Sequence, residues 1–228
     1  SFPTRLSSDL KHGLRATFMP KPFAHLTGNG CHAHVSLWTG AGENLFAGDG
    51  EMGLSDTAYA FLGGLIAHAP ALTAIVNPTV NSYKRLNAPV TSSGATWSPN
   101  TITYGGNNRT HMVRIPDAGR IELRLPDGAA NPYLMPAALL AAGLDGIETK
   151  ADPGQRLDVD MYAEGHTIDA PQLPLNLLDA VRALEADTAL MEGMGADAAA
   201  SFVKFKRAEW TEYKGQLTEW ERATTLDC

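Results

Sequence analysis

The sequence has 228 residues, of which 44% are hydrophobic and 19% charged, and its formal net charge is −7. This composition is typical of a globular chain rather than a disordered one. The acidic balance argues against nucleic acid or an anionic membrane as a partner. The chain has two cysteines, no apolar run of membrane-spanning length and no signal-peptide centre near its start, so we expect a cytoplasmic protein.

The first half of the chain predicts strands, one long helix and one long loop. Residues 15–19 and 32–38 have the composition of strands, and a Thr-Gly-Asn-Gly turn separates them. Ser55 is a good N-cap for an apolar helix that ends at Pro70. Residues 77–108 are rich in Gly, Ser, Thr, Asn and Pro, and so long a loop in a compact domain is usually functional or mobile.

The second half predicts two more strands and then mostly helix. Strands are expected near residues 113–115 and over 121–125, followed by a helix over 132–147 that is capped by Asn131. Helical periodicity returns over 175–187 and 199–222. The layout predicts an α+β fold in which a mostly antiparallel, curved sheet carries the active site and helices wrap it. Residues 1–150 form the strand and arginine-loop core, and residues 151–228 form a helical C-terminal region.

Arginines are concentrated in one part of this acidic chain, because five of the eleven lie between residues 84 and 124. A guanidinium grips carboxylates and phosphates at two points, so the concentration predicts an anionic ligand. In the segment Gly-Arg-Ile-Glu-Leu-Arg, strand alternation places Arg120, Glu122 and Arg124 on one face and aliphatic residues on the other. The pattern favours the floor of a charged site over the alternative, a solvated edge strand.

Residues 31–36 place His32, His34 and Ser36 on one face of another strand. Two imidazoles alone bind metal weakly, and Glu122 is the obvious carboxylate to join them. Histidine with carboxylate oxygens suits Mg²⁺ or Mn²⁺ in a phosphate site better than structural zinc. The alternative is a hydrogen-bonded histidine pair on a half-exposed strand, and the arginines make it the weaker interpretation. Cys31 is interpreted as a packing residue that points away from the histidine face.

These segments together resemble the glutamine synthetase family. The motifs that carry the resemblance, in order, are H-G-L-R-A-T-F-M-P-K-P, G-N-G-C-H-A-H-V-S-L, N-P-T-V-N-S-Y-K-R-L, N-N-R-T-H-M-V-R-I-P and R-I-E-L-R-L-P-D-G-A-A-N-P-Y-L. The resemblance covers about residues 11–228 and is to the C-terminal part of the catalytic domain. Within the family, the chain looks like the branch that includes γ-glutamylmethylamide synthetases.

The resemblance implies a role for each matching residue. The metal ligands would be His32 and Glu122. The residues implied to bind glutamate are Thr27, Gly28, Arg85, Arg109 and Arg124. The residues implied to face ATP are His34, Ser36, Arg109, Arg114 and Arg120. Arg109 would also be the catalytic residue, because it would contact the transferring phosphoryl group.

The family's reaction is ATP-dependent and uses Mg²⁺ or Mn²⁺: the γ-carboxylate of glutamate is phosphorylated, and an amine then displaces phosphate. The resemblance therefore implies a glutamate–amine ligase that forms a homo-oligomeric ring at full length. The acceptor would be ammonia or methylamine. After Leu86 the chain continues with Asn-Ala-Pro-Val in place of the family's glutamate-containing flap, and the loss of that charge favours an alkylamine.

The resemblance also indicates an incomplete site. The family's Glu-x-Glu pair and further metal-binding glutamates have no match in this sequence, and Glu219-Trp220-Glu221 lies in the predicted C-terminal helix. We therefore expect a fragment of a longer enzyme. The alternatives are a non-catalytic nucleotide-binding or assembly module, and a γ-glutamyl ligase for another amine such as a polyamine.

Overall fold

The structure, a computed structural model, describes residues 12–14, 16–88 and 98–227. Its described strands form one sheet in the order β1-β4-β3-β2, and they are β1 (Ala33–Val35), β2 (Tyr104–Gly105), β3 (Val113–Asp117) and β4 (Arg120–Leu123). The β1–β4 and β3–β4 pairs are antiparallel, whereas β2 and β3 are parallel. The α+β class is confirmed, and the sheet is mixed, with mostly antiparallel pairing.

The register of the sheet brings ionisable side chains into one row. Glu122 on β4 lies opposite His34 on β1 and opposite Arg114 on β3. Residues directly opposite one another on paired strands project from the same face. Because β4 has a partner strand on each side, the alternative of a solvated edge strand is wrong. Ile121 and Leu123, on the other face of β4, are fully buried, as the alternation predicted.

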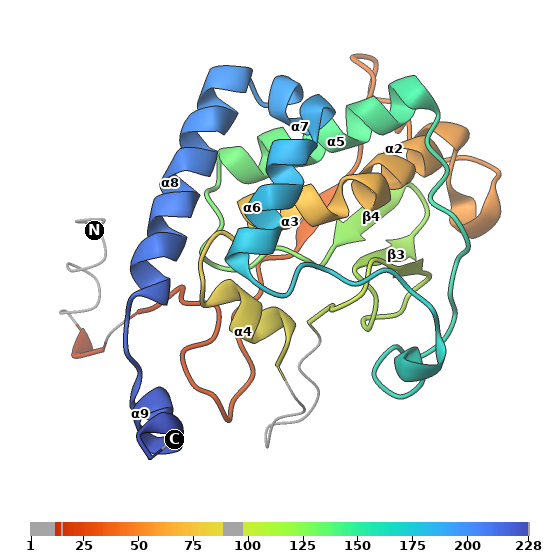
Figure 1. The fold of residues 1–228 in the computed structure, drawn as a ribbon. Helices are drawn as coiled ribbons and strands as arrows, with labels where there is room; N and C mark the ends of the chain where they lie inside the picture. Colours follow the sequence, from red (N-terminus) through yellow and green to blue (C-terminus); the bar gives the residue numbers. More distant parts are fainter. Residues whose placement is uncertain (1–11, 15, 89–97, 228) are drawn as a thin grey trace.

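Helices cover the apolar face of the sheet (Figure 1). Most of the buried apolar residues come from α2 (Asp56–Ala67), α3 (Ala69–Val76), α5 (Leu134–Thr149) and α6 (Leu177–Ala186). The helix α2 packs against α5, and α3 packs against α6. In the part of the chain that the structure describes, no single helix is long and apolar enough to cross a membrane. The α2–α3 pair, bent by 74°, meets that test by length and composition only.

The other helices are short or lie outside this layer. They are α7 (Thr188–Gly193) and α8 (Ala196–Lys214), which pack against each other and against α6, then α4 (Ser82–Leu86), α9 (Glu219–Thr225) and the 3-10 turns Glu51–Gly53 and Gly165–Thr167. In Figure 1, α8 runs along one side of the molecule and α9 follows it at the C-terminus. The helix α4 carries Arg85.

Two glycines allow α2 and α5 to cross in backbone contact. An added Cβ on Gly64 would lie 2.1 Å from the carbonyl oxygen of Ala142, and one on Gly146 would lie 2.3 Å from the carbonyl oxygen of Ala60. Both distances are too short for real atoms, so only residues without a side chain fit at these positions. The crossing therefore has no layer of side chains between the two helices at this point.

The predicted helix after Ser55 is confirmed, because the Ser55 hydroxyl accepts a hydrogen bond from the backbone N–H of Ala58 at 3.1 Å. It ends at the bend before Pro70, where α3 begins. The helix expected from residue 132 starts two residues later, at Leu134. The Asn131 side chain still accepts hydrogen bonds at this start, from the N–H groups of residues 133 and 134.

Three of the predicted elements differ from the structure. The loop expected over residues 77–108 contains α4 and β2. Residues 16–19 form no strand, because Asn29 donates hydrogen bonds to the carbonyls of Met19 and Pro20 and so ties this segment to the turn rather than to the sheet. The helix expected over 199–222 is two helices. The first ends at Lys214, with Gly215 as its C-cap, and Thr218 caps the start of α9 in a capping box.

Candidate functional site

The centre of the candidate site is the carboxylate of Glu122, a residue that is 3% exposed. Its Oε2 accepts a hydrogen bond from Arg114 Nη1 at 2.6 Å, and its Oε1 accepts one from Arg124 Nη1 at 2.9 Å. Burial acts to raise the pKa of Glu122, but the Arg114 hydrogen bond and the two arginine charges outweigh burial and lower the pKa. The carboxylate is therefore ionised at neutral pH and held between two cations.

His32 and His34 approach the same carboxylate from the β1 segment. His32 Nδ1 lies 3.1 Å from Glu122 Oε1, and His34 Nε2 lies 3.8 Å from it. Burial and the positive charge of Arg124 lower the pKa of His32 to about 4, although Glu122 opposes the shift. The His32 imidazole is thus neutral at neutral pH. Arg124 Nη1 also lies 3.3 Å from His32 Nδ1, so the tautomer follows from which contact this nitrogen makes: it donates to Glu122 when protonated and accepts from Arg124 when not.

Two loop residues hold the arginines of this row in place. Arg114 donates from Nε and Nη2 to Asn107 Oδ1, at 2.8 and 2.5 Å. Arg124 donates from Nε to the carbonyl oxygen of Arg109 at 3.1 Å. The Arg109 residue itself is exposed. The backbone of the loop that carries Arg109 is therefore fixed to Arg124, the residue that follows β4.

Arg120 lies in a different environment from Arg114 and Arg124. It pairs with Asp117 across the turn between β3 and β4, and its side chain is 42% exposed. The arginines that contact Glu122 are thus Arg114 and Arg124, whereas Arg120 is the first residue of β4.

Arg85 lies beneath the glycine turn that precedes β1. It is 4% exposed, and its Nη1 and Nη2 donate to the carbonyl oxygens of Leu125 and Arg124, at 2.9 and 3.3 Å. An added Cβ on Gly30 would lie 3.1 Å from Arg85 Nη2, and one on Gly28 would lie 3.2 Å from Arg85 Cγ. The glycines therefore let the turn lie directly against the arginine, and Gly28 and Arg85 are neighbours, as the glutamate-site prediction requires.

The residues that flank β1 differ in exposure. Thr27 is exposed at the start of the turn, and the Ser36 hydroxyl accepts a hydrogen bond from Trp38 Nε1 at 2.9 Å. The interpretation of Cys31 as a packing residue is wrong, because Cys31 is a free, exposed cysteine. It precedes β1, the strand at one end of the described sheet, so the helical layer does not cover it.

The described residues do not by themselves make a metal site. Among them, no group of three or more His, Cys, Asp or Glu side chains is arranged to hold an ion. His32 and Glu122 lie together, but both oxygens of Glu122 already accept hydrogen bonds from arginines. The assignment of these two residues as metal ligands stays a prediction.

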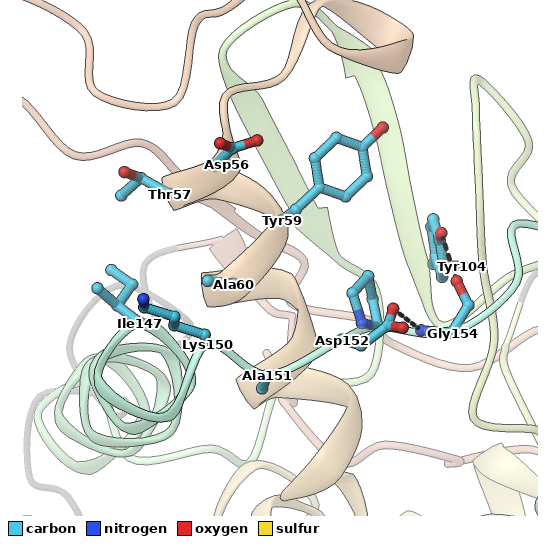
Figure 2. Close-up of a pocket in the computed structure, with 11 residues that line it drawn as sticks. Asp56, Thr57, Tyr59, Ala60, Tyr104, Ile147, Lys150, Ala151, Asp152 and Gly154 are labelled. Atoms are coloured by element: carbon cyan, nitrogen blue, oxygen red, sulfur yellow. Dashed lines mark hydrogen bonds between the residues drawn. The ribbon is translucent and has the colours of Figure 1, made fainter.

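An open hollow of about 680 Å³ is separate from this row of charges (Figure 2). It lies between the first turns of α2, the end of α5 and the segment that follows α5. Tyr104, whose hydroxyl donates to the carbonyl oxygen of Gly154 at 2.9 Å, forms part of its wall. None of the predicted site residues lines it. The candidate site is therefore on the sheet face and not in this hollow.

Two polar partners of the arginines were not predicted. Asn107 accepts from Arg114, and Asp127 is fully buried near Arg85, where its charge acts to raise the pKa of that arginine against the effect of burial. Both belong to the quoted motifs N-N-R-T-H and R-L-P-D-G. An acceptor side chain within an arginine-rich motif is the signal that could have identified them.

The mixed sheet, its helical layer and the row of arginines and histidines around the buried Glu122 define a domain with a charged site suited to carboxylate and phosphate groups. The family model "Glutamine synthetase, catalytic domain" matches residues 8–225, so the chain belongs to the glutamine synthetase family. The predicted family is confirmed.

Several relatives are similar along most of this chain. It is 64% identical to a glutamine synthetase of Rhizobium leguminosarum bv. phaseoli, over 95% of the chain and 51% of the relative. It is 44% identical to a glutamate–methylamine ligase of Methyloversatilis universalis, over 94% of the chain and 50% of the relative. A solved GmaS–ADP complex is 84% identical, with a TM-score of 0.92, over 96% of the chain and 51% of that protein. The chain thus spans about half the length of the relatives it matches, and it resembles the predicted γ-glutamylmethylamide synthetase branch.

Proposed function

We propose that the chain is part of an ATP-dependent ligase that joins ammonia or methylamine to the γ-carboxylate of L-glutamate through γ-glutamyl phosphate. The observation that carries the proposal is the buried row in which Arg114 and Arg124 hold Glu122, in a chain 84% identical to a protein solved with ADP. Phosphoryl transfer depends mainly on positioning and on neutralising charge, and fixed guanidinium groups do both.

The roles proposed for the residues follow from their positions. Arg85 and Arg124, with Thr27 and Gly28, bind glutamate, and Arg109 contacts the transferring phosphoryl group. The residues proposed to face ATP are His34, Ser36, Arg109, Arg114 and Arg120. Support comes from the contact of the Gly28 turn with Arg85 and from the hydrogen bond that fixes the Arg109 backbone to Arg124.

A divalent cation, Mg²⁺ or Mn²⁺, belongs to the proposal for the longer protein. His32 and Glu122 would supply two of its ligands, and the others would lie outside the described residues. When bound, the ion would neutralise phosphate charge. The longer protein is proposed to act as a homo-oligomeric ring in the cytoplasm, as the family resemblance implies.

The acceptor amine is proposed to be methylamine or ammonia. The likeness to GmaS and to a glutamate–methylamine ligase supports methylamine, whereas the 64% identity to a glutamine synthetase supports ammonia. The flap that suggested an alkylamine falls largely on residues 89–97, which lie outside the described residues.

The test is ATP turnover by the full-length protein that contains this chain. ADP release would be measured with glutamate and ammonium, methylamine or a polyamine, and the product identified by mass spectrometry. We expect ADP release that requires both glutamate and ammonium or methylamine. Nucleotide binding without turnover would contradict the proposal and favour a non-catalytic nucleotide-binding module. Turnover with a polyamine alone would favour a ligase for that amine.

A further inference from the structure

Asp127 is a fully buried carboxylate close to the proposed glutamate site. Its Oδ2 accepts a hydrogen bond from Asn77 Nδ2 at 3.0 Å, and its Oδ1 accepts one from the backbone N–H of Ala129 at 2.9 Å. Burial raises the pKa of this carboxylate, and the neighbouring Asn77, Ser82 and Arg85 side chains act to lower it. Burying a carboxylate costs free energy, so the presence of Asp127 at this position has to be explained by its contacts.

The neighbours of Asp127 are the segments that surround Arg85. The Asp127 N–H donates to the carbonyl oxygen of Val76 at the end of α3, at 3.2 Å. Residue 127 also forms a backbone bridge with Gly30 of the glycine turn. Ser82 and Arg85 lie on the same short helix, α4. Asp127 therefore joins the end of α3, the helix that carries Arg85 and the turn that lies against it.

The Asn77 side chain connects Asp127 to the group that holds Arg85. Its Nδ2 donates to Asp127 and also to the carbonyl oxygen of Leu125, at 3.0 Å. The same Leu125 oxygen accepts the hydrogen bond from Arg85 Nη1 at 2.9 Å. The Asn77 amide thus contacts both the buried Asp127 carboxylate and the Leu125 carbonyl oxygen that accepts from Arg85.

Asp127 and the Leu125 carbonyl together determine which way the Asn77 amide faces. Both oxygens accept from Asn77 Nδ2, so the amide turns its NH₂ group toward them. In this orientation Asn77 Oδ1 is buried without a hydrogen-bond partner. Such an atom costs free energy, and it persists here because the opposite orientation would place amide oxygen against carboxylate oxygen and against the Leu125 carbonyl.

We propose that Asp127 is a positioning residue for Arg85. By accepting a hydrogen bond from Asn77, it holds in place the amide that donates to the Leu125 carbonyl, and the guanidinium bound to that carbonyl then stays against the glycine turn. The inference rests on the proposed function, in which Arg85 binds a carboxylate of glutamate.

The test is the variant Asp127→Asn in the full-length protein. It keeps the shape of the side chain, but an asparagine has one acceptor oxygen in place of two, so it cannot accept from both the Asn77 amide and the Ala129 N–H. We expect the KM for glutamate to rise about tenfold while the KM for ATP changes less than about twofold. A residue with a merely structural role would not separate the two constants.

Asp179→Asn is the matched control. Asp179 also accepts from an asparagine, Asn176 Nδ2 at 2.6 Å, but it lies exposed on α6. We expect this variant to leave both KM values unchanged.

The outcomes separate the inference from the function on which it rests. If the unmodified protein turns over and Asp127→Asn leaves the KM for glutamate unchanged, the positioning role is wrong and the proposed function stands. Equal rises in both KM values would also overturn it. If the unmodified protein has no glutamate-dependent turnover, the proposed function fails and the inference fails with it.

A milder variant covers the case in which Asp127→Asn does not fold. Ser82→Ala removes a hydroxyl beside the carboxylate, and we expect a rise of about two- to threefold in the KM for glutamate alone. An unchanged value would overturn the inference.

Discussion

The row of charges on the sheet and the helical layer behind it are stabilised in different ways. Around Glu122 the chain buries ionised groups, whose desolvation offsets much of their attraction, so such groups add little net stability. Between α2 and α5 it buries apolar surface, which stabilises by about 25 cal/mol per Å². The comparison indicates that the layer maintains the fold, and in the proposed function the row serves binding. Substitutions in each region then have separable effects.

The largest effect is expected from Arg124→Ala in the full-length protein. Arg124 is 3% exposed and donates to Glu122, and in the proposed function it also binds glutamate. We expect glutamate-dependent ADP release to fall by about a thousandfold, the upper range for loss of one transition-state donor. Arg182→Ala, an exposed arginine that pairs with Asp179 on α6, is the control. Near-normal turnover of the Arg124 variant would show that this arginine does not bind the substrate.

A large effect on stability rather than on turnover is expected from Phe61→Ala in the helical layer. Phe61 is fully buried, lies 5.1 Å from the ring of Phe46 between centroids, and lies so close to Gly143 that an added Cβ there would be 2.0 Å from it. We expect the free energy of unfolding to fall by about 3 kcal/mol, with the KM for glutamate unchanged in the folded protein.

Denaturant unfolding measures this loss, and Phe205→Ala serves as its control. Phe205 is 75% exposed, so we expect a change within about 0.5 kcal/mol. Equal losses in the two variants would mean that the helical layer does not dominate stability.

The smallest effect is expected at His68, which contacts two aspartates inside the helical layer. Its Nδ1 lies 2.6 Å from Asp187 Oδ2 and its Nε2 lies 2.9 Å from Asp145 Oδ2, which joins the α2–α3 bend to α5 and to the start of α7. The Asp187 hydrogen bond raises the pKa of His68 against the effect of burial, and Asp145 adds to the increase.

A raised histidine pKa stabilises the folded state at low pH. The stabilisation is fully present below the ordinary pKa of 6.5 and is lost as the pH rises through the higher folded value. We expect His68→Gln to lower the free energy of unfolding by about 1–2 kcal/mol near pH 6 and by less at alkaline pH. Unfolding curves from pH 5 to 9 would measure this. A constant difference between the two proteins would contradict the charged contact.

The candidate site could be predicted where a local pattern reflects the geometry. Period-two alternation placed Glu122 and Arg124 on one face, and the H-x-H spacing did the same for His32 and His34. The register that puts Glu122 opposite both His34 and Arg114 could not be predicted, because strand pairing depends on contacts between distant segments.

Two other features were beyond local patterns. The strand expected over residues 15–19 has the right composition, yet hydrogen bonds to Asn29 decide its conformation. The Asn77–Asp127 contact joins residues 50 positions apart and follows no periodicity.

The backbone contact at Gly64 and Gly146 limits how this sequence can diverge. Where side chains separate two helices, a larger residue on one can be matched by a smaller one on the other. At Gly64 and Gly146 the facing atoms belong to the backbone, so no side chain can be made smaller to create space. An added methyl group must then move a whole helix, and with it the sheet on which the helices pack. Divergence of the sequence would therefore be confined to the loops and the outer helix faces, while the interhelical distance stays fixed.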